Sequence, residues 1–128
     1  MALHGLEHVL VLTNDLEATR AFYCDVLGFE AGARPQLAFP GYWLYLDGPA
    51  CVHIADRAAY EAHAEEVGLG RVEGPIDHLA FAAGDHATLA ARLETAGVET
   101  VANDVPGAGF RQLFLEDPNG VRIELNIR

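Results

Sequence analysis

The amino-acid sequence contains one pattern twice, and this duplication restricts the possible folds more than any other feature. Residues 6–11 (Leu-Glu-His-Val-Leu-Val) correspond to residues 76–81 (Ile-Asp-His-Leu-Ala-Phe), so His78 follows His8 by 70 positions. Near the other end of each copy, Glu124 follows His53 by 71 positions. Repeats at a fixed period report duplicated supersecondary units. The sequence therefore predicts two similar units, each with a strand, a helix and three further strands (βαβββ).

Local signals place the elements of each unit. Apolar runs indicate strands, while an Asn or Asp before a run with helical spacing and a Gly after it indicate the two ends of a helix. The segment 117–120 (Asp-Pro-Asn-Gly) combines a preset φ with a residue that tolerates positive φ, so we expect a tight turn into the final strand. Strands are expected at 6–13, 29–33, 42–46, 50–55, 76–81, 98–101, 111–116 and 121–126, a short extended piece at 36–39, and helices at 16–27, 58–67 and 86–96.

These elements predict an α+β fold in a single domain. With 51% hydrophobic residues, a chain of this length can bury a sizeable core. We expect one domain over residues 1–128, with a first βαβββ module at 4–56, a connector helix segment at 57–74 and a second module at 75–128.

The charge balance excludes some classes of partner. Eight basic against 19 acidic residues give a net charge of −11, which repels both a nucleic-acid backbone and an anionic membrane surface. Apolar runs stay short of the roughly 20 residues that a membrane helix needs, and the first residues do not resemble a secretory signal. We therefore expect a cytoplasmic protein without nucleic-acid or membrane partners. Cys24 and Cys51 stand outside any Cys-x-x-Cys pattern and are expected to be reduced and structural.

The duplication also has a chemical consequence. In the final strand, Glu124 lies on the opposite face from Val121, Ile123 and Leu125, and a carboxylate in the middle of a partly buried strand needs a partner. The repeat makes His8 equivalent to His78, and His53 equivalent to Glu124. A pseudo-two-fold axis between the units can therefore bring these four ligand-competent side chains toward one point.

At these residues the chain resembles the vicinal oxygen chelate superfamily, the group of glyoxalases, bleomycin-resistance proteins and extradiol dioxygenases. The resemblance covers essentially the whole chain and is carried by the segments 6–8 (Leu-Glu-His), 22–29 (Phe-Tyr-x-x-Val-Leu-Gly-Phe), 77–81 (Asp-His-Leu-Ala-Phe) and 117–125 (Asp-Pro-Asn-Gly-x-x-Ile-Glu-Leu). It implies a curved mixed sheet from each unit, a cup between paired units, and a homodimer. It also implies a divalent metal bound by His8, His78 and Glu124, with His53 as a fourth ligand or a base.

The donor set supports a metal site without the resemblance as well. Two imidazoles and one carboxylate on strands leave coordination positions open for a bidentate substrate, and Zn, Ni, Mn or Fe can use such a set, so the metal's identity stays open. The alternative is that His8 and His78 are half-buried strand histidines and that Glu124 pairs with an arginine. His53 suits a ligand, a base or a plain lining residue. The glyoxalase I branch has a glutamate at the position of His53, so histidine here weakens a prediction of glyoxalase I activity.

Further residues are candidates for substrate binding. Trp43 and Tyr45 belong to a set of aromatic residues on strands that line or back the cup, and they are either core residues or stack on substrate; the others are Tyr42, Phe110 and Phe114. Arg34, Arg111 and Gln112 are candidates for holding a substrate carboxylate or carbonyl, with a solvated surface position as the alternative for the arginines.

Three functions are compatible with these residues. The first is metal-assisted catalysis on a small molecule with vicinal oxygens, in which the metal stabilises an oxyanion or enediolate in a lyase, isomerase or thiol transferase. The second is an Fe(II) extradiol-type ring-cleaving dioxygenase. The third is a metal-free antibiotic-sequestering protein, against which the joint presence of His8, His78 and Glu124 argues. The substrate and the reaction class do not follow from the sequence.

Overall fold

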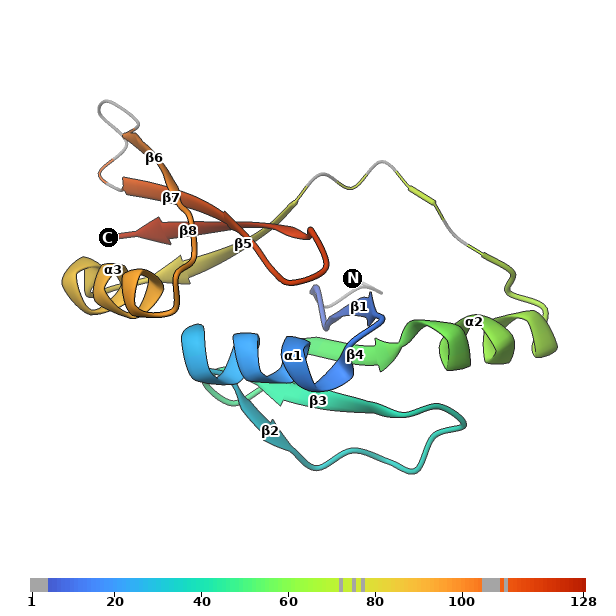
Figure 1. The fold of residues 1–128 in the computed structure, drawn as a ribbon. Coiled ribbons are helices and arrows are strands. Elements are labelled where there is room, and N and C mark those ends of the chain that lie inside the picture. Colours follow the sequence, from blue (N-terminus) through green and yellow to red (C-terminus); the bar gives the residue numbers. More distant parts are fainter. Residues whose placement is uncertain (1–4, 72, 75, 77, 105–108, 110) are drawn as a thin grey trace. The chain divides into compact units, whose positions relative to one another are not determined.

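The computed structural model describes all residues except 1–4, 72, 75, 77, 105–108 and 110 (Figure 1). The chain divides into two compact units, Met1–Glu73 and Gly74–Arg128, and each is described by itself. Phe110, which the sequence analysis named among the aromatic residues of the cup, lies outside the described residues.

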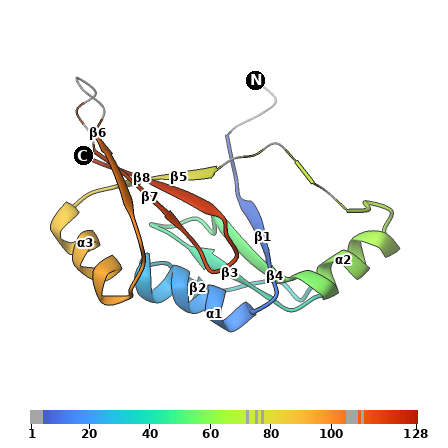
Figure 2. The same cartoon turned by 45° about the horizontal axis from the view of Figure 1, so that its top comes forward.

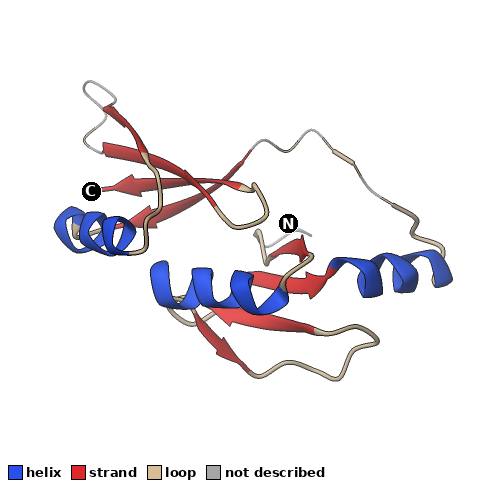
Figure 3. Ribbon diagram, viewed as in Figure 1, coloured by secondary structure: helices blue, strands red, loops and turns tan. Residues whose placement is uncertain are grey.

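The two units repeat the same order of elements (Figure 3). The first unit contains β1 (Val9–Thr13), α1 (Leu16–Ala21), the π-helical turn η1 (Phe22–Val26), β2 (Glu30–Gly32), β3 (Gly41–Tyr45), β4 (Val52–Asp56) and α2 (Arg57–Glu66). The second contains β5 (His78–Ala83), α3 (His86–Thr95), β6 (Val101–Asp104), β7 (Arg111–Glu116) and β8 (Arg122–Ile127).

Each unit forms a four-stranded mixed sheet with the same topology. The strand orders are β1-β4-β3-β2 and β5-β8-β7-β6. In both sheets the first strand runs parallel to the last strand of its unit, and the remaining pairs are antiparallel. The predicted βαβββ duplication is therefore confirmed.

Burial alternates along the strands of the first unit and separates two faces of its sheet. Helix α1 packs against β3 and β4 (Figure 2). One face supplies buried core residues, which are Val11, Thr13, Leu44, Val52 and Ile54, joined by Thr19, Phe22 and Tyr23 from the helical segment. Trp43 and His53 alternate with these residues and lie on the other face.

The second sheet shows the same alternation. Leu113 and Leu115 of β7 and residues 123, 125 and 127 of β8 (Ile, Leu and Ile) are buried. The residues between them are Gln112, Phe114, Glu124 and Asn126, which share the opposite face. Glu124 is buried on this face, with 9% of its surface exposed.

The predicted helix ends are present. Asp15, Asp56 and Asp85 each accept a hydrogen bond from a backbone N–H three residues later, as N-cap residues do. Helix α3 ends in a Schellman arrangement, in which the Val98 amide donates to the Leu93 carbonyl (2.9 Å) and Gly97 takes a φ of +70°.

Several predicted segments differ from the structure. The segment 36–39 is not a strand: Pro35 and Pro40 flank it, and the Arg34 side chain takes the Phe39 carbonyl as its acceptor. Strand β6 begins at Val101 rather than 98, because the Val98 amide closes α3. The helix expected at 16–27 changes to π-helical geometry at Phe22, where the Leu27 amide donates to the Phe22 carbonyl five residues earlier.

Candidate functional site

Three rings stack on one face of the first sheet. The His8 and His53 rings lie 3.9 Å apart between centroids at 14°, and the Trp43 and His53 rings lie 4.2 Å apart at 9°. Trp43 and His53 are register partners on β3 and β4, and His8 immediately precedes β1, the other neighbour of β4. The local topology therefore holds His53 between an indole and a second imidazole.

The surroundings of His53 favour its neutral form. Partial burial lowers the pKa of His53 below 6.5, and the charges of His8 and Arg34 lower it further. A hydrogen bond to the Ala50 backbone and the charge of Glu7 oppose this shift. A neutral imidazole keeps one nitrogen lone pair available, so His53 can accept a proton or a metal ion at neutral pH.

In the second unit, His78 and Glu124 face each other across neighbouring parallel strands. The His78 Nε2 atom lies 4.0 Å from Glu124 Oε2. The His78 ring meets the Phe114 ring edge to face, with centroids 6.4 Å apart at 88°. Phe114 is the register partner of Glu124, just as Trp43 is of His53, so the two sheets carry an aromatic residue at corresponding positions.

Amide groups orient the Glu124 carboxylate. Gln112 Nε2 donates to Glu124 Oε1 (2.7 Å), and Asn126 Nδ2 donates to Glu124 Oε2 (3.2 Å). Gln112 also donates to Asn126 Oδ1 (3.3 Å), while its own oxygen accepts from Asn103 Nδ2 (2.8 Å). Within the described residues, then, the partners of Glu124 are two amides and an imidazole rather than an arginine.

The sequence did not predict this network of amide side chains around Glu124. Gln112 was expected to bind substrate, but in the structure it donates to Glu124. Asn126 shares a strand face with Glu124 because it follows by two positions, which was a usable signal. Asn103 and Gln112 become neighbours only through the register of β6 with β7, which no local pattern reveals.

The other predicted substrate-binding residues are dispersed. Arg34 donates from Nη2 to the Phe39 carbonyl (2.7 Å) and lies over the Phe39 ring, with Cζ 5.4 Å from the centroid. Arg111 is exposed at the start of β7. The Tyr45 hydroxyl donates to the Ala33 carbonyl.

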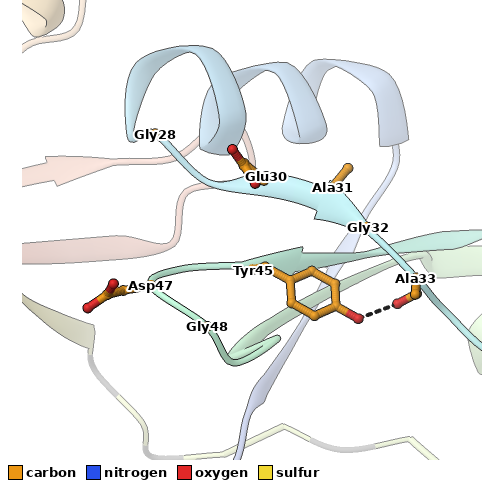
Figure 4. A pocket seen from close by; sticks show the side chains of 8 residues that line it. All are labelled: Gly28, Glu30, Ala31, Gly32, Ala33, Tyr45, Asp47 and Gly48. Atoms are coloured by element: carbon orange, nitrogen blue, oxygen red, sulfur yellow. Dashed lines mark hydrogen bonds between the residues drawn. The ribbon is translucent and has the colours of Figure 1, made fainter.

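Tyr45 lines an open pocket of about 550 Å³ at the edge of the first sheet (Figure 4). The Tyr45 ring packs on Gly32, where an added Cβ would lie 2.8 Å from a ring carbon. His8, His53 and Trp43 are not among the lining residues, which are Gly28, Glu30, Ala31, Gly32, Ala33, Tyr45, Asp47 and Gly48. The pocket is therefore separate from the stacked rings.

Imidazole and carboxylate are donor types that divalent ions accept. Among the described residues, no group of three or more His, Cys, Asp or Glu side chains could hold a metal ion; the predicted donors are arranged as one pair in each unit. With ligand bonds of about 2.1 Å, two donors on one ion lie about 3.0 Å apart in octahedral geometry and about 3.4 Å apart in tetrahedral geometry. The 4.0 Å between His78 Nε2 and Glu124 Oε2 is longer than this separation.

The remaining candidates carry no catalytic feature. Cys24 and Cys51 are free thiols, and burial raises the pKa of Cys51, which favours the unreactive protonated form. None of the helices in the described part of the chain has the length and apolar character to cross a membrane.

Comparison with known proteins supports the predicted resemblance. Lactoylglutathione lyase of Salmonella typhimurium is 30% identical over 129 residues, covering 94% of this chain and 90% of that protein. The crystal structure of lactoylglutathione lyase from Agrobacterium tumefaciens matches with a TM-score of 0.73 at 19% identity, covering 98% of this chain and 96% of the other. That of an antibiotic-binding protein from a Streptomyces species matches with a TM-score of 0.70 at 23% identity, covering 99% and 98%.

These matches confirm the α+β fold with two mixed sheets as glyoxalase-like. Relatives with this fold include both enzymes and binding proteins. The Glyoxalase/Bleomycin resistance protein/Dioxygenase superfamily model matches residues 5–125, and the chain belongs to this superfamily.

Proposed function

We propose that the protein is a divalent-metal-dependent enzyme acting on a small molecule that is chelated through two neighbouring oxygens. His8, His78 and Glu124 are the proposed ligands, and His53 is a fourth ligand or a base. The observation that carries this proposal is the Glu124 carboxylate, which is buried, held by two amide donors and faced by the His78 imidazole.

In this proposal each group has its own task. Gln112 and Asn126 each donate to a different oxygen of Glu124, so they fix the plane of the carboxylate and leave its other lone pairs for a ligand. His53 is held between two rings, and burial lowers its pKa, so its neutral imidazole can accept a proton from the substrate. A bound divalent ion would supply Lewis-acid stabilisation of negative charge that develops on the substrate oxygens.

The reaction class stays open between two enzyme types. A lyase or isomerase is supported by the lactoylglutathione lyase relative, although His53 stands where the glyoxalase I branch has a glutamate. An Fe(II) ring-cleaving dioxygenase would use the same ligands, and the identity of the metal separates the two.

A metal-free binding protein is the second candidate function. The stacked rings of Trp43, His53 and His8 form a platform on which a planar drug could stack, and one structural relative binds an antibiotic. Such a platform does not require a buried carboxylate with two amide donors, so we favour the metalloenzyme.

Metal titration of chelator-treated protein tests the proposal. We expect one ion per chain, a raised melting temperature, and loss of binding in His78→Ala and Glu124→Gln, because each variant removes a ligand. His86→Ala, which changes a histidine at the start of α3 that is not a proposed ligand, is the matched control and should bind normally. Wild-type affinity in His78→Ala and Glu124→Gln contradicts the assignment. Metal content of the purified protein then separates the classes: iron favours the dioxygenase, and nickel or zinc favours the lyase or isomerase.

Gln112→Leu extends the same titration to the amide network. This variant leaves Glu124 Oε1 without its donor, so we expect metal affinity to fall about 10- to 100-fold. The absorption spectrum of bound Co²⁺ should change as well, which a purely structural role of Gln112 would not cause.

A further inference from the structure

The amide pair of the second sheet has a counterpart in the first sheet that lacks polar side chains. Gln112 and Asn126 are register partners on β7 and β8. At the offset of 71 that relates Glu124 to His53, the corresponding residues are Gly41 and Ala55, which are also register partners. The place that holds two amides beside Glu124 therefore offers only a hydrogen atom and a methyl group near His53.

The Arg34 guanidinium occupies this space. A Cβ atom added to Gly41 would lie 3.1 Å from Arg34 Nη2 and 2.3 Å from the Ile54 carbonyl oxygen, so the guanidinium lies close to Gly41 and a larger residue there would collide with the Ile54 carbonyl. The Phe39 carbonyl and the Phe39 ring hold the guanidinium from its other side. Arg34 is thus held by Phe39 next to Gly41.

The charge of Arg34 is not neutralised by a carboxylate. Arg20, Arg57 and Arg71 each pair with a glutamate. Arg34 has no acidic partner within ion-pair distance among the described residues, although the chain contains 19 acidic residues. A guanidinium carries five N–H donors, and the Phe39 carbonyl takes only one of them.

We propose that Arg34 binds a carboxylate of the substrate through the N–H groups that the Phe39 carbonyl does not take. A planar guanidinium fork matches a carboxylate with two parallel hydrogen bonds, which Lys could not reproduce. Of the three residues expected to hold a substrate carboxylate or carbonyl, Gln112 is engaged with Glu124 and Arg111 lies at the exposed start of β7, so Arg34 has the geometry for this role. The identification of the ligand as a substrate rests on the proposed function. The anion site itself consists of residues of the first unit alone.

Titration of the metal-free full-length protein with sodium acetate tests the site. The backbone amide resonances of Gly41 and Ala55 report binding, with chloride replaced at constant ionic strength. We expect saturable shifts in the wild type, loss of these shifts in Arg34→Gln, and weakening by about tenfold in Arg34→Lys, which keeps the charge but not the fork. Arg20→Gln removes the same charge from α1 and should bind acetate like the wild type.

The other outcomes contradict the inference. Equal acetate shifts in Arg34→Gln and the wild type, or a wild type that does not distinguish acetate from chloride, overturn the site. Tighter binding of inorganic phosphate than of acetate overturns the carboxylate assignment in favour of a phosphoryl group. Because the assay contains no metal, a failed metal titration leaves its result valid, and a failed acetate titration leaves the metal site standing.

Discussion

At the scale of single residues, the two halves use one position for two different chemistries. Glu124 lies among donors from neighbouring strands, and His53 lies between two aromatic rings. The repeat in the sequence predicts that these residues are equivalent. It could not predict their surroundings, because the amide and ring partners come from other strands and depend on register.

The protonation of His53 can be followed through Trp43, the single tryptophan of the chain. A protonated imidazole stacked on an indole quenches its fluorescence, so in metal-free protein we expect emission to fall as the pH drops through a value below 6.5. Because the folded pKa of His53 is lowered, the unfolded state binds more protons between the two pKa values. Stability that is present above pH 6.5 is therefore lost as the pH falls to the folded pKa.

His53→Gln is the variant that checks this linkage. It should remove the low-pH change in Trp43 emission and reduce the dependence of the urea midpoint on pH in that window. His63→Gln, a histidine of α2 that contacts Phe39 and Tyr60, is the control. An emission midpoint above pH 6.5 in the wild type would contradict the assigned burial of His53.

At the scale of elements, short-range signals in the sequence predicted the ends of the helices better than the lengths of the strands. The N-cap aspartates and the glycines after each helix act through neighbouring backbone groups, so sequence alone was sufficient for them. Strand length depends on the partner. Strand β1 begins at Val9 rather than Leu6 because its ladder with β4 starts at the pair Val9 and Val52.

The turn before β8 is the clearest local prediction, and Asp117 is the residue to change. Asp117 is 5% exposed, and its Oδ1 atom accepts from the amides of Asn119 (2.7 Å) and Val121 (2.9 Å). Gly120 follows with a φ of +80°. Asp117→Ala leaves these amides without their acceptor, so we expect a loss of about 2 kcal/mol in the free energy of unfolding.

Urea unfolding of Asp117→Ala and Asp117→Asn measures this contribution. Asn keeps an oxygen that can accept from the same amides, so it should lose clearly less stability than Ala. Equal losses in the two variants would show that the charge of Asp117, and not the turn hydrogen bonds, is responsible.

At the scale of the whole molecule, the duplication predicted the topology, which the matching sheet orders confirm, and the motifs predicted the family, which the superfamily match confirms. The metal, the reaction and the substrate stay proposals because they depend on how four side chains from two units come together. Charge and spacing can name those side chains. They do not determine the final separation of donors, on which metal binding depends to within a few tenths of an ångström.

The resemblance to the superfamily implies a homodimer. Two exposed apolar residues are candidates for contacts between the chains. Leu6 and Ile76 are equivalent in the repeat, precede the edge strands β1 and β5, and are 90% and 80% exposed. Exposed apolar groups beside open sheet edges favour association. We expect sedimentation at twice the mass of one chain, and dissociation when Leu6 and Ile76 are both changed to Asp. Leu69→Asp, at a residue that is 67% exposed and lies outside both sheet edges, should stay dimeric, and a monomeric wild type would reject the prediction.

Metal titration of the dissociated variant then tests whether one chain or two supply the metal ligands. Metal affinity that falls with dissociation requires donors from two chains, whereas unchanged affinity assigns all donors to one chain.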